Sequence, residues 1–223
     1  MFEQILSGVR VIVFDIDDTL LLWKHNKRWK NNTLAFIPEK EWDAVNKKQD
    51  VYEDTESNLV IKDILLTTVN KINKDTYKTY KEYNLAEAIS RQIKVFALSA
   101  DTSKYAMQNK TNKLMKEYPD NFYKENILIC DTPEQKIKFL DTLRATYDCN
   151  PDEILLIDDL QSTLMAADIK GYRVETPQGI MNEWIIRTGL FKKKRGKIYN
   201  SISINADRVI FLCENISYFF CHI

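Results

Sequence analysis

The sequence predicts an α/β fold in which a parallel β-sheet lies between two helical layers, with a small helical cap inserted after the first strand. Four short apolar runs, the first of them rich in β-branched residues, are typical of parallel strands that are buried on both faces, and residues 172–175 indicate a fifth strand. Amphipathic helical patterns separate most of these runs, and such alternation favours a parallel sheet with crossover helices. One long charged stretch interrupts the alternation and indicates the insert.

The predicted strands and helices follow one another along most of the chain. The strands are expected at residues 9–14, 94–98, 127–130, 154–157 and 172–175. Helices are expected at residues 101–118, 133–147 and 161–170. The second helix has a clear start, because Thr132 can cap it, Pro133 suits its first position and Gln135 completes a capping box. Gly171 is a fitting residue at the end of the third helix.

The domain organisation follows from where the alternation breaks. Residues 22–91 are long, charged and helix-rich, with amphipathic spacing at 58–73 and 76–90, and are interpreted as the helical cap. Residues 1–21 and 92–180 would then form the core domain. Residues 181–223 are expected to be a C-terminal extension packed on the core, and the chain after Pro177 reads as a less regular tail.

Bulk properties narrow the functional classes. The 223 residues carry no net charge, so no overall field recruits nucleic acid. The four cysteines have no zinc-like spacing, which favours reduced thiols in a cytosol-like compartment. No signal peptide or transmembrane segment is expected, and the predicted location is cytoplasmic. The basic run from Lys192 to Lys197 could make weak contact with an anionic membrane, or could be a solvated loop.

Three polar side chains, Asp15, Asp17 and Thr19, directly follow the first predicted strand. Ligands of parallel sheets bind beyond the carboxyl ends of the strands, where Asp15 stands. Neighbouring carboxylates repel unless a cation intervenes, and Mg²⁺ prefers oxygen ligands. Asp15 could attack phosphorus, Asp17 could transfer protons to and from the leaving oxygen and water, and Thr19 could orient Asp17. The alternative is an acidic turn held by local hydrogen bonds.

Further polar residues follow the other strands. Ser99 ends the second apolar run and could bind a phosphate oxygen, or could simply be a turn or capping residue. Lys136, in the first turn of the capped helix, could stabilise a phosphate and a phospho-aspartate. Lys138 competes for that role, and either lysine could instead be a surface residue. Asp158 and Asp159 follow the fourth run, where adjacent carboxylates are unfavourable without a cation, although they could also cap the next helix.

Taken in order, these motifs resemble those of the haloacid dehalogenase-like superfamily of phosphohydrolases. FDIDDTL is similar to its first motif, hhhDxDxT, and FALSA is similar to its second, a strand ending in Ser or Thr. Lys136 matches the third-motif lysine. LLIDD, followed by a helix and Gly171, is similar to the acidic fourth motif. The matching stretch spans about residues 9 to 177, and the resemblance implies a Rossmann-like three-layer core with a helical cap.

The resemblance also implies an activity and a cofactor. It implies a Mg²⁺-dependent phosphatase that hydrolyses a phosphate monoester through a phospho-aspartyl intermediate on Asp15. Mg²⁺ would be held by Asp15, the backbone carbonyl of Asp17 and Asp159, with Asp158 as a direct ligand or as support. An acid two residues after the nucleophile resembles the phosphatases rather than the dehalogenases. One departure is Thr163, which stands where many members carry Asp or Asn.

The sequence leaves the substrate and two alternative functions open. The phosphorylated substrate could be a small metabolite or a protein side chain such as phosphotyrosine. One alternative is a phosphotransferase with the same intermediate. The other is a non-catalytic module whose basic tail binds a membrane or a protein partner.

Overall fold

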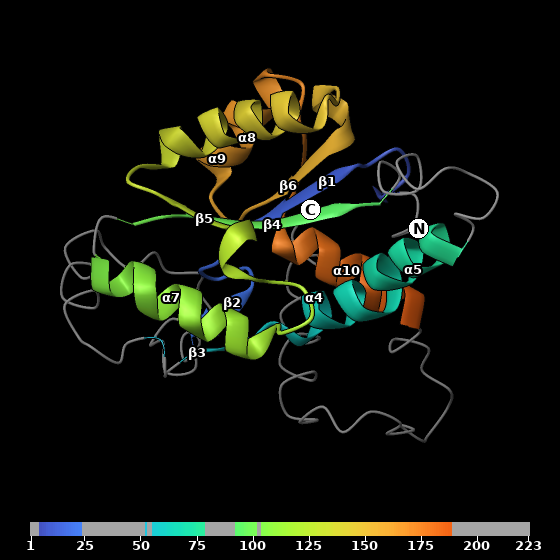
Figure 1. Cartoon of the computed structure of the whole chain (residues 1–223), viewed down its shortest axis with the longest axis horizontal. Helices are drawn as coiled ribbons and strands as arrows, with labels where there is room; N and C mark the ends of the chain where they lie inside the picture. The colour runs from blue at the N-terminus through green and yellow to red at the C-terminus, as the bar shows by residue number, and fades with distance from the viewer. Residues whose placement is uncertain (1–4, 24–51, 53–54, 79–91, 102–103, 189–223) are drawn as a thin grey trace, which may run out of the picture.

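The structure is a computed structural model that describes residues 5–23, 52, 55–78, 92–101 and 104–188 of the chain. Its centre is a five-stranded sheet in the order β5-β4-β1-β6-β7, in which every neighbouring pair is parallel (Figure 1). The strands are β1 (Val11–Phe14), β4 (Lys94–Ala100), β5 (Ile127–Cys130), β6 (Ile154–Ile157) and β7 (Arg173–Glu175). The predicted α/β fold with a parallel sheet is therefore confirmed.

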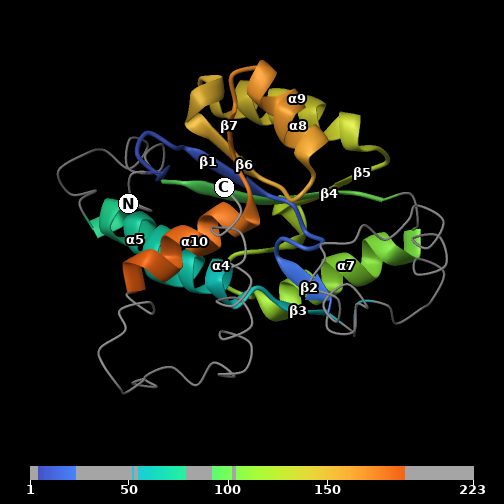
Figure 2. The same cartoon turned by 180° about the vertical axis from the view of Figure 1, so that it is seen from behind.

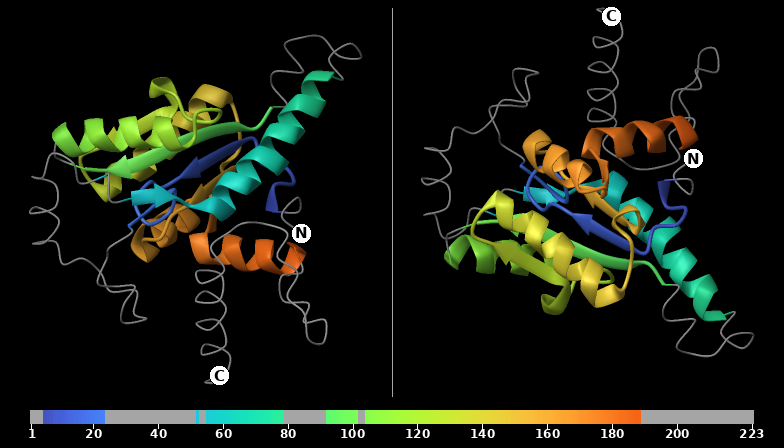
Figure 3. Two further views of the ribbon diagram at one scale, coloured as in Figure 1. Left: turned by 90° about the horizontal axis from the view of Figure 1, so that it is seen from below. Right: turned by 90° about the horizontal axis from the view of Figure 1, so that it is seen from above.

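Helices cover both faces of the sheet and complete the three layers (Figures 1 and 3). One face carries α8 (Pro133–Tyr147) and α9 (Gln161–Ile169), whereas the other carries α4 (Leu59–Ile64), α5 (Asn70–Lys78), α7 (Lys104–Glu117) and α10 (Pro177–Thr188). Alternate residues of β1 point to opposite faces, as a strand requires. Ile12 and Phe14 pack into one apolar cluster, and Val11 and Val13 pack into the other. All four are buried, so the central strand is anchored from both sides.

Two predicted strand limits differ from the structure for reasons of hydrogen bonding. The first strand begins at Val11 rather than residue 9, because the amide of Val9 bonds to the carbonyl of Leu6 in a turn. The second strand continues beyond residue 98 to Ala100, because Ser99 and Ala100 pair with Ile129 and Cys130 of β5. This extension places Ser99 inside the sheet rather than in the loop after it.

The first stretch of predicted amphipathic spacing, 58–73, is helical from Leu59, and the helix continues into the second stretch, 76–90, as far as Lys78. From Leu59 to Lys78 the chain is continuously helical, with a π-helical segment, Leu65–Val69, between α4 and α5. The hydroxyl of Thr76 donates to the carbonyl of Ile72 at 2.8 Å, a bond to the preceding turn of the same helix.

This helical segment packs on the sheet. Ile61, Leu65 and Val69 are spaced four residues apart and are buried in the apolar cluster that contains Ile12 and Phe14. Part of the predicted cap therefore contributes to a layer of the core. Residues 24–51 and 79–91 lie outside the described residues, and the domain boundaries stay predictions.

Residues 177–188 are helical, whereas a less regular tail was expected after Pro177. Pro177 occupies the start of α10, and the hydroxyl of Thr176 accepts the amide of Gly179 at 2.9 Å, which caps the helix. Ile180 is fully buried, and α10 lies beside α4 (Figure 2). Among the described helices, none combines the length and apolarity needed to cross a membrane. The basic run from Lys192 to Lys197 lies outside the described residues.

A small antiparallel pair, β2 (Leu21–Trp23) and β3 (Thr55–Ser57), follows the turn after β1. Asn58 ties this pair to the turn and to α4. Its side chain accepts the amides of Val60 and Ile61 at the start of α4 and donates to the carbonyl of Thr19 at 3.0 Å. The buried Asn58 side chain thus holds the turn that carries the acidic motif against the start of α4.

Replacing Asn58 by alanine is expected to lower the free energy of unfolding by about 2–4 kcal/mol. A lost N-cap costs roughly 1 kcal/mol, and an unsatisfied buried carbonyl costs a further 1–3 kcal/mol or so. Urea denaturation measures the change. Asn112→Ala is the control, because Asn112 is exposed on α7 and should change stability by less than about 0.5 kcal/mol. Equal stability of the two variants would show that Asn58 has no anchoring role.

Candidate active site

The site lies at the carboxyl ends of three adjacent strands. β1 is the centre of the sheet, with β4 on one side and β6 on the other. Phe14, the last residue of β1, is level with Ala97 of β4 and Ile157 of β6. Asp15 and Asp158 therefore leave neighbouring strands at the same level, and the amide of Asp15 donates to the carbonyl of Ile157 at 2.8 Å. The parallel register alone brings these side chains together.

Lys136 bridges two of the carboxylates. Its ammonium group lies 2.6 Å from Asp15 Oδ1 and 2.8 Å from Asp158 Oδ2, and all three side chains are buried. Lys136 occupies the first turn of α8, where the helix begins near the strand ends. Lys138 is exposed, so the structure places Lys136, and not its competitor, against the carboxylates. We refer to Asp15, Lys136 and Asp158 as the Asp15 cluster.

Negative charge exceeds positive charge around this cluster. Burial raises the pKa of Asp15 well above its ordinary value; Lys136 opposes that rise, and the Asp158 and Asp159 carboxylates reinforce it. Partial burial and the nearby Asp158 carboxylate raise the pKa of Asp159 to about 7, even though this side chain reaches solvent. One lysine is therefore not enough to balance the carboxylates, and a further cation would relieve the repulsion.

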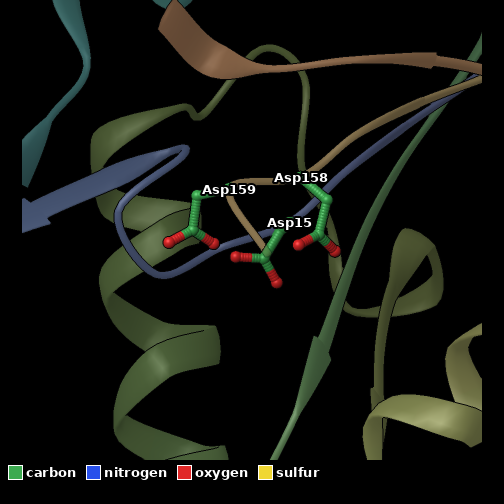
Figure 4. A group of neighbouring side chains, drawn as sticks. All are labelled: Asp15, Asp158 and Asp159. Carbon is green, nitrogen blue, oxygen red and sulfur yellow. The ribbon is translucent and has the colours of Figure 1, made fainter. Parts of the chain in front are cut away.

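The donor set suits a hard divalent cation. Asp15, Asp158 and Asp159 each offer a carboxylate oxygen, and these oxygens lie within 4.8 Å of one another (Figure 4). Oxygen ligands of this kind are those that Mg²⁺ prefers. Both oxygens of Asp158 already accept protein donors, one from the amide of Leu160 and the other from Lys136. This favours Asp159 as the direct ligand beside Asp15, with Asp158 in support.

The side chain of Asp17 turns to a second cation, Lys110. Lys110 Nζ lies 2.6 Å from Asp17 Oδ2, and the hydroxyl of Ser99 donates to the same oxygen at 3.2 Å. The hydroxyl of Tyr52 donates to Asp17 Oδ1 at 3.1 Å. Lys110 also lies 3.2 Å from Asp101 Oδ2. We refer to Asp17, Ser99, Lys110, Tyr52 and Asp101 as the Asp17 cluster.

Sequence reasoning missed Lys110, Tyr52 and Asp101. A signal for Lys110 was present, because it precedes Leu114 and Tyr118 by four and eight residues, and both of these are buried. The spacing puts Lys110 on the inward face of α7. Tyr52 lies within the predicted insert, and no pattern in the sequence indicates its contact with Asp17.

The expected hydrogen bond from Thr19 to Asp17 is not formed. Asp18 adopts a left-handed conformation, with φ at 54°, which turns the chain between these two residues. The hydroxyl of Thr19 is consequently buried and has no hydrogen-bond partner within the described part of the chain, and the same holds for Thr163. Phosphate binding by Thr19 stays a prediction.

The fold and the placement of the motifs agree with what the resemblance to the haloacid dehalogenase-like superfamily implies. No family model matches the sequence, and no curated protein matches it.

Several solved structures are similar to this chain. One is a haloacid dehalogenase family enzyme from Bacteroides thetaiotaomicron, solved as the wild-type protein in complex with magnesium and inorganic phosphate. It is 16% identical, with a TM-score of 0.38, over 77% of this chain and 96% of that chain. A haloacid dehalogenase-like protein from Bacteroides fragilis is 14% identical, with a TM-score of 0.34, over 74% and 86% of the two chains. The UTR4 protein from Saccharomyces cerevisiae is 11% identical, with a TM-score of 0.32, over 75% and 89%.

Proposed function

We propose that the protein is a Mg²⁺-dependent phosphohydrolase of the haloacid dehalogenase type that cleaves a phosphate monoester through a phospho-aspartyl intermediate on Asp15. The observation that carries this proposal is the buried Lys136, which bridges Asp15 and Asp158 with Asp159 close by. A structural acidic turn would not require a buried lysine and three converging carboxylates at the end of the central strands.

The proposed reaction has two steps that use the chain's own side chains. In the first, an oxygen of Asp15 attacks the phosphorus atom, the bond from phosphorus to the leaving oxygen breaks, and Asp17 gives that oxygen a proton. In the second, Asp17 takes a proton from water while the water oxygen attacks phosphorus. The bond from phosphorus to Asp15 then breaks and inorganic phosphate leaves. The roles of nucleophile and acid–base therefore fall on carboxylates that stand two residues apart.

The surrounding residues would hold the phosphoryl group and the metal ion. Ser99 and Lys136 would bind phosphate oxygens, and Asp15, Asp159 and the backbone carbonyl of Asp17 would hold Mg²⁺ with support from Asp158. Bound Mg²⁺ would offset the negative charge of the phosphoryl oxygens and of these carboxylates. The substrate is a phosphate monoester, either a small metabolite or a phosphorylated side chain such as phosphotyrosine.

Hydrolysis of p-nitrophenyl phosphate is expected to require Mg²⁺. Removing the ion with EDTA should lower the rate by about 10²-fold or more, because the charge stabilisation by a bound metal amounts to several kcal/mol. Release of inorganic phosphate measures the rate, and excess Mg²⁺ added back is the control. Brief incubation with a substrate labelled in its phosphate group should also give a labelled protein. Hydroxylamine should remove this label, because it cleaves acyl phosphates.

Two outcomes would redirect the proposal. Transfer of phosphate to added alcohols in preference to water would indicate a phosphotransferase, which shares the intermediate. Absence of both phosphate release and covalent labelling across a panel of sugar phosphates and phosphopeptides would contradict an enzymatic role. That result would favour the non-catalytic binding module.

A further inference from the structure

Lys110 is a buried lysine of the site, and the proposed two-step reaction gives it no role. Only 1% of its surface is exposed, and its ammonium group contacts three polar side chains: Asp17 at 2.6 Å, Ser99 at 2.8 Å and Asp101 at 3.2 Å. Burial by itself would lower the pKa of Lys110, but the Asp17 and Asp101 carboxylates raise it above its ordinary value. The side chain therefore brings a full positive charge into the site.

The contacts of Lys110 constrain the Asp17 carboxylate. Asp17 Oδ2 accepts from both Lys110 and Ser99, whereas Oδ1 accepts from Tyr52. Burial and the Asp17 carboxylate raise the pKa of Tyr52 well above its ordinary value, so its phenol keeps its proton and donates. The three donors come from α7, β4 and the segment before β3, and together they fix the direction in which Asp17 points.

The two lysines of the site have different partners. Lys136 contacts Asp15 and Asp158, which belong to the Asp15 cluster. Lys110 contacts Asp17 and Ser99, which belong to the Asp17 cluster. Since a charge buried this completely is unfavourable unless it is paired, the position of Lys110 is tied to these partners.

We propose that Lys110 is a positioning residue that holds the Asp17 carboxylate and the Ser99 hydroxyl in place, so that Asp17 can protonate the leaving oxygen while Asp15 attacks phosphorus. The inference rests on the proposed function and deepens it, because it assigns a second lysine to the proton-transfer side of the same reaction. Lys110 acts through Asp17 and not on phosphorus.

A leaving-group test separates positioning from general structural support. Proton transfer matters most when the leaving oxygen is a poor leaving group, as in phenyl phosphate, and matters little for p-nitrophenyl phosphate. A residue that acts through the acid should therefore have a larger effect on phenyl phosphate. A residue that only supports the fold should affect both substrates equally.

The experiment compares Lys110→Met with Lys113→Met in Mg²⁺. Lys113 is a matched control, because it is also buried on α7 but pairs with Glu117 at 2.9 Å, away from Asp17. General acid–base catalysis contributes about 10²–10⁴-fold, so we expect Lys110→Met to lower kcat about tenfold on p-nitrophenyl phosphate and about 100-fold or more on phenyl phosphate. Lys113→Met should give the same ratio of the two rates as the wild type. In an Asp17→Asn background, Lys110→Met should add little, because the group it positions is gone.

The outcomes distinguish the inference from the function on which it rests. A wild-type protein inactive on both substrates would overturn both. If the wild type is active, either of two results would overturn only the role of Lys110. One is an equal fall in kcat on both substrates in Lys110→Met, and the other is a full further fall in kcat when Lys110→Met is added to Asp17→Asn. If Lys110→Met does not fold, Lys110→Met combined with Asp101→Asn preserves the local charge balance, and the same leaving-group criterion applies to it.

Discussion

Replacing Asp15 by asparagine is expected to lower kcat for phosphate monoester hydrolysis by roughly 10⁴–10⁶-fold, the scale on which the loss of a nucleophile acts in other enzymes. Asparagine keeps the size of the side chain but cannot form the acyl phosphate, so the covalent route is removed. Lys136 keeps its contact with Asp158, and the fold should therefore survive the substitution. Phosphate release under saturating substrate measures the effect.

Asp131→Asn is the matched control for Asp15→Asn. Asp131 also directly follows a strand of the sheet, β5, but its side chain is exposed. We expect its kcat to stay within about twofold of the wild type, as for a surface substitution away from the site. A second measurement follows Mg²⁺ binding, since a ligand that binds the folded state raises the unfolding midpoint. The rise should be smaller in Asp15→Asn than in Asp131→Asn. Equal hydrolysis rates for these two variants would end the assignment of Asp15 as nucleophile.

The sheet was predictable because its strands are buried on both faces. Apolar, β-branched runs such as that of β1 have few other stable environments, and the strands β5 and β6 match their predicted limits. The helix α8 also matches its predicted limits, with Pro133 at its first position, but the predicted capping box is wrong. The side chain of Thr132 makes no capping hydrogen bond, and Gln135 accepts the amide of Asp131 at 3.0 Å.

Where a helix packs is less predictable. The helical segment from Leu59 to Lys78 was assigned to the cap, but Ile61, Leu65 and Val69 place it against the sheet.

The site was partly predictable for a related reason. Residues that directly follow parallel strands must lie at one edge, so Asp15 and Asp158 could be placed together before their strands were ordered. Contacts made by helices do not follow from this rule. Whether Lys110 or Lys113 faces the strand ends depends on how α7 is rotated against the sheet, and this rotation is set by the packing of Leu114 and Tyr118. The pairing of Lys110 with Asp17 is therefore a tertiary property.

Replacing Lys136 by methionine is expected to lower the free energy of unfolding by about 3–5 kcal/mol, because removing one partner leaves buried charges uncompensated. Asp15 and Asp158 both depend on this ammonium group, at 2.6 and 2.8 Å. For a chain of this size, each kcal/mol corresponds to roughly 2–4 °C in the unfolding midpoint, so a fall of about 6–20 °C is expected. Hydrolysis should be lost as well, because the phosphoryl group would lose a cation that faces it.

Lys138→Met tests whether the loss of stability in Lys136→Met comes from its contacts with the two carboxylates. Lys138 stands two residues away on the same helix and is exposed, so its removal should change stability by less than about 0.5 kcal/mol.

Mg²⁺ should also affect the stability of Lys136→Met. If the carboxylates around Asp15 bind a divalent ion, Mg²⁺ should recover part of the stability lost in Lys136→Met, since the ion replaces some of the missing positive charge. Chemical denaturation in Mg²⁺ and in EDTA measures both effects. Equal stability of Lys136→Met and Lys138→Met would show that Lys136 does not balance the carboxylates, and the electrostatic basis of the proposed phosphate site would be lost with it.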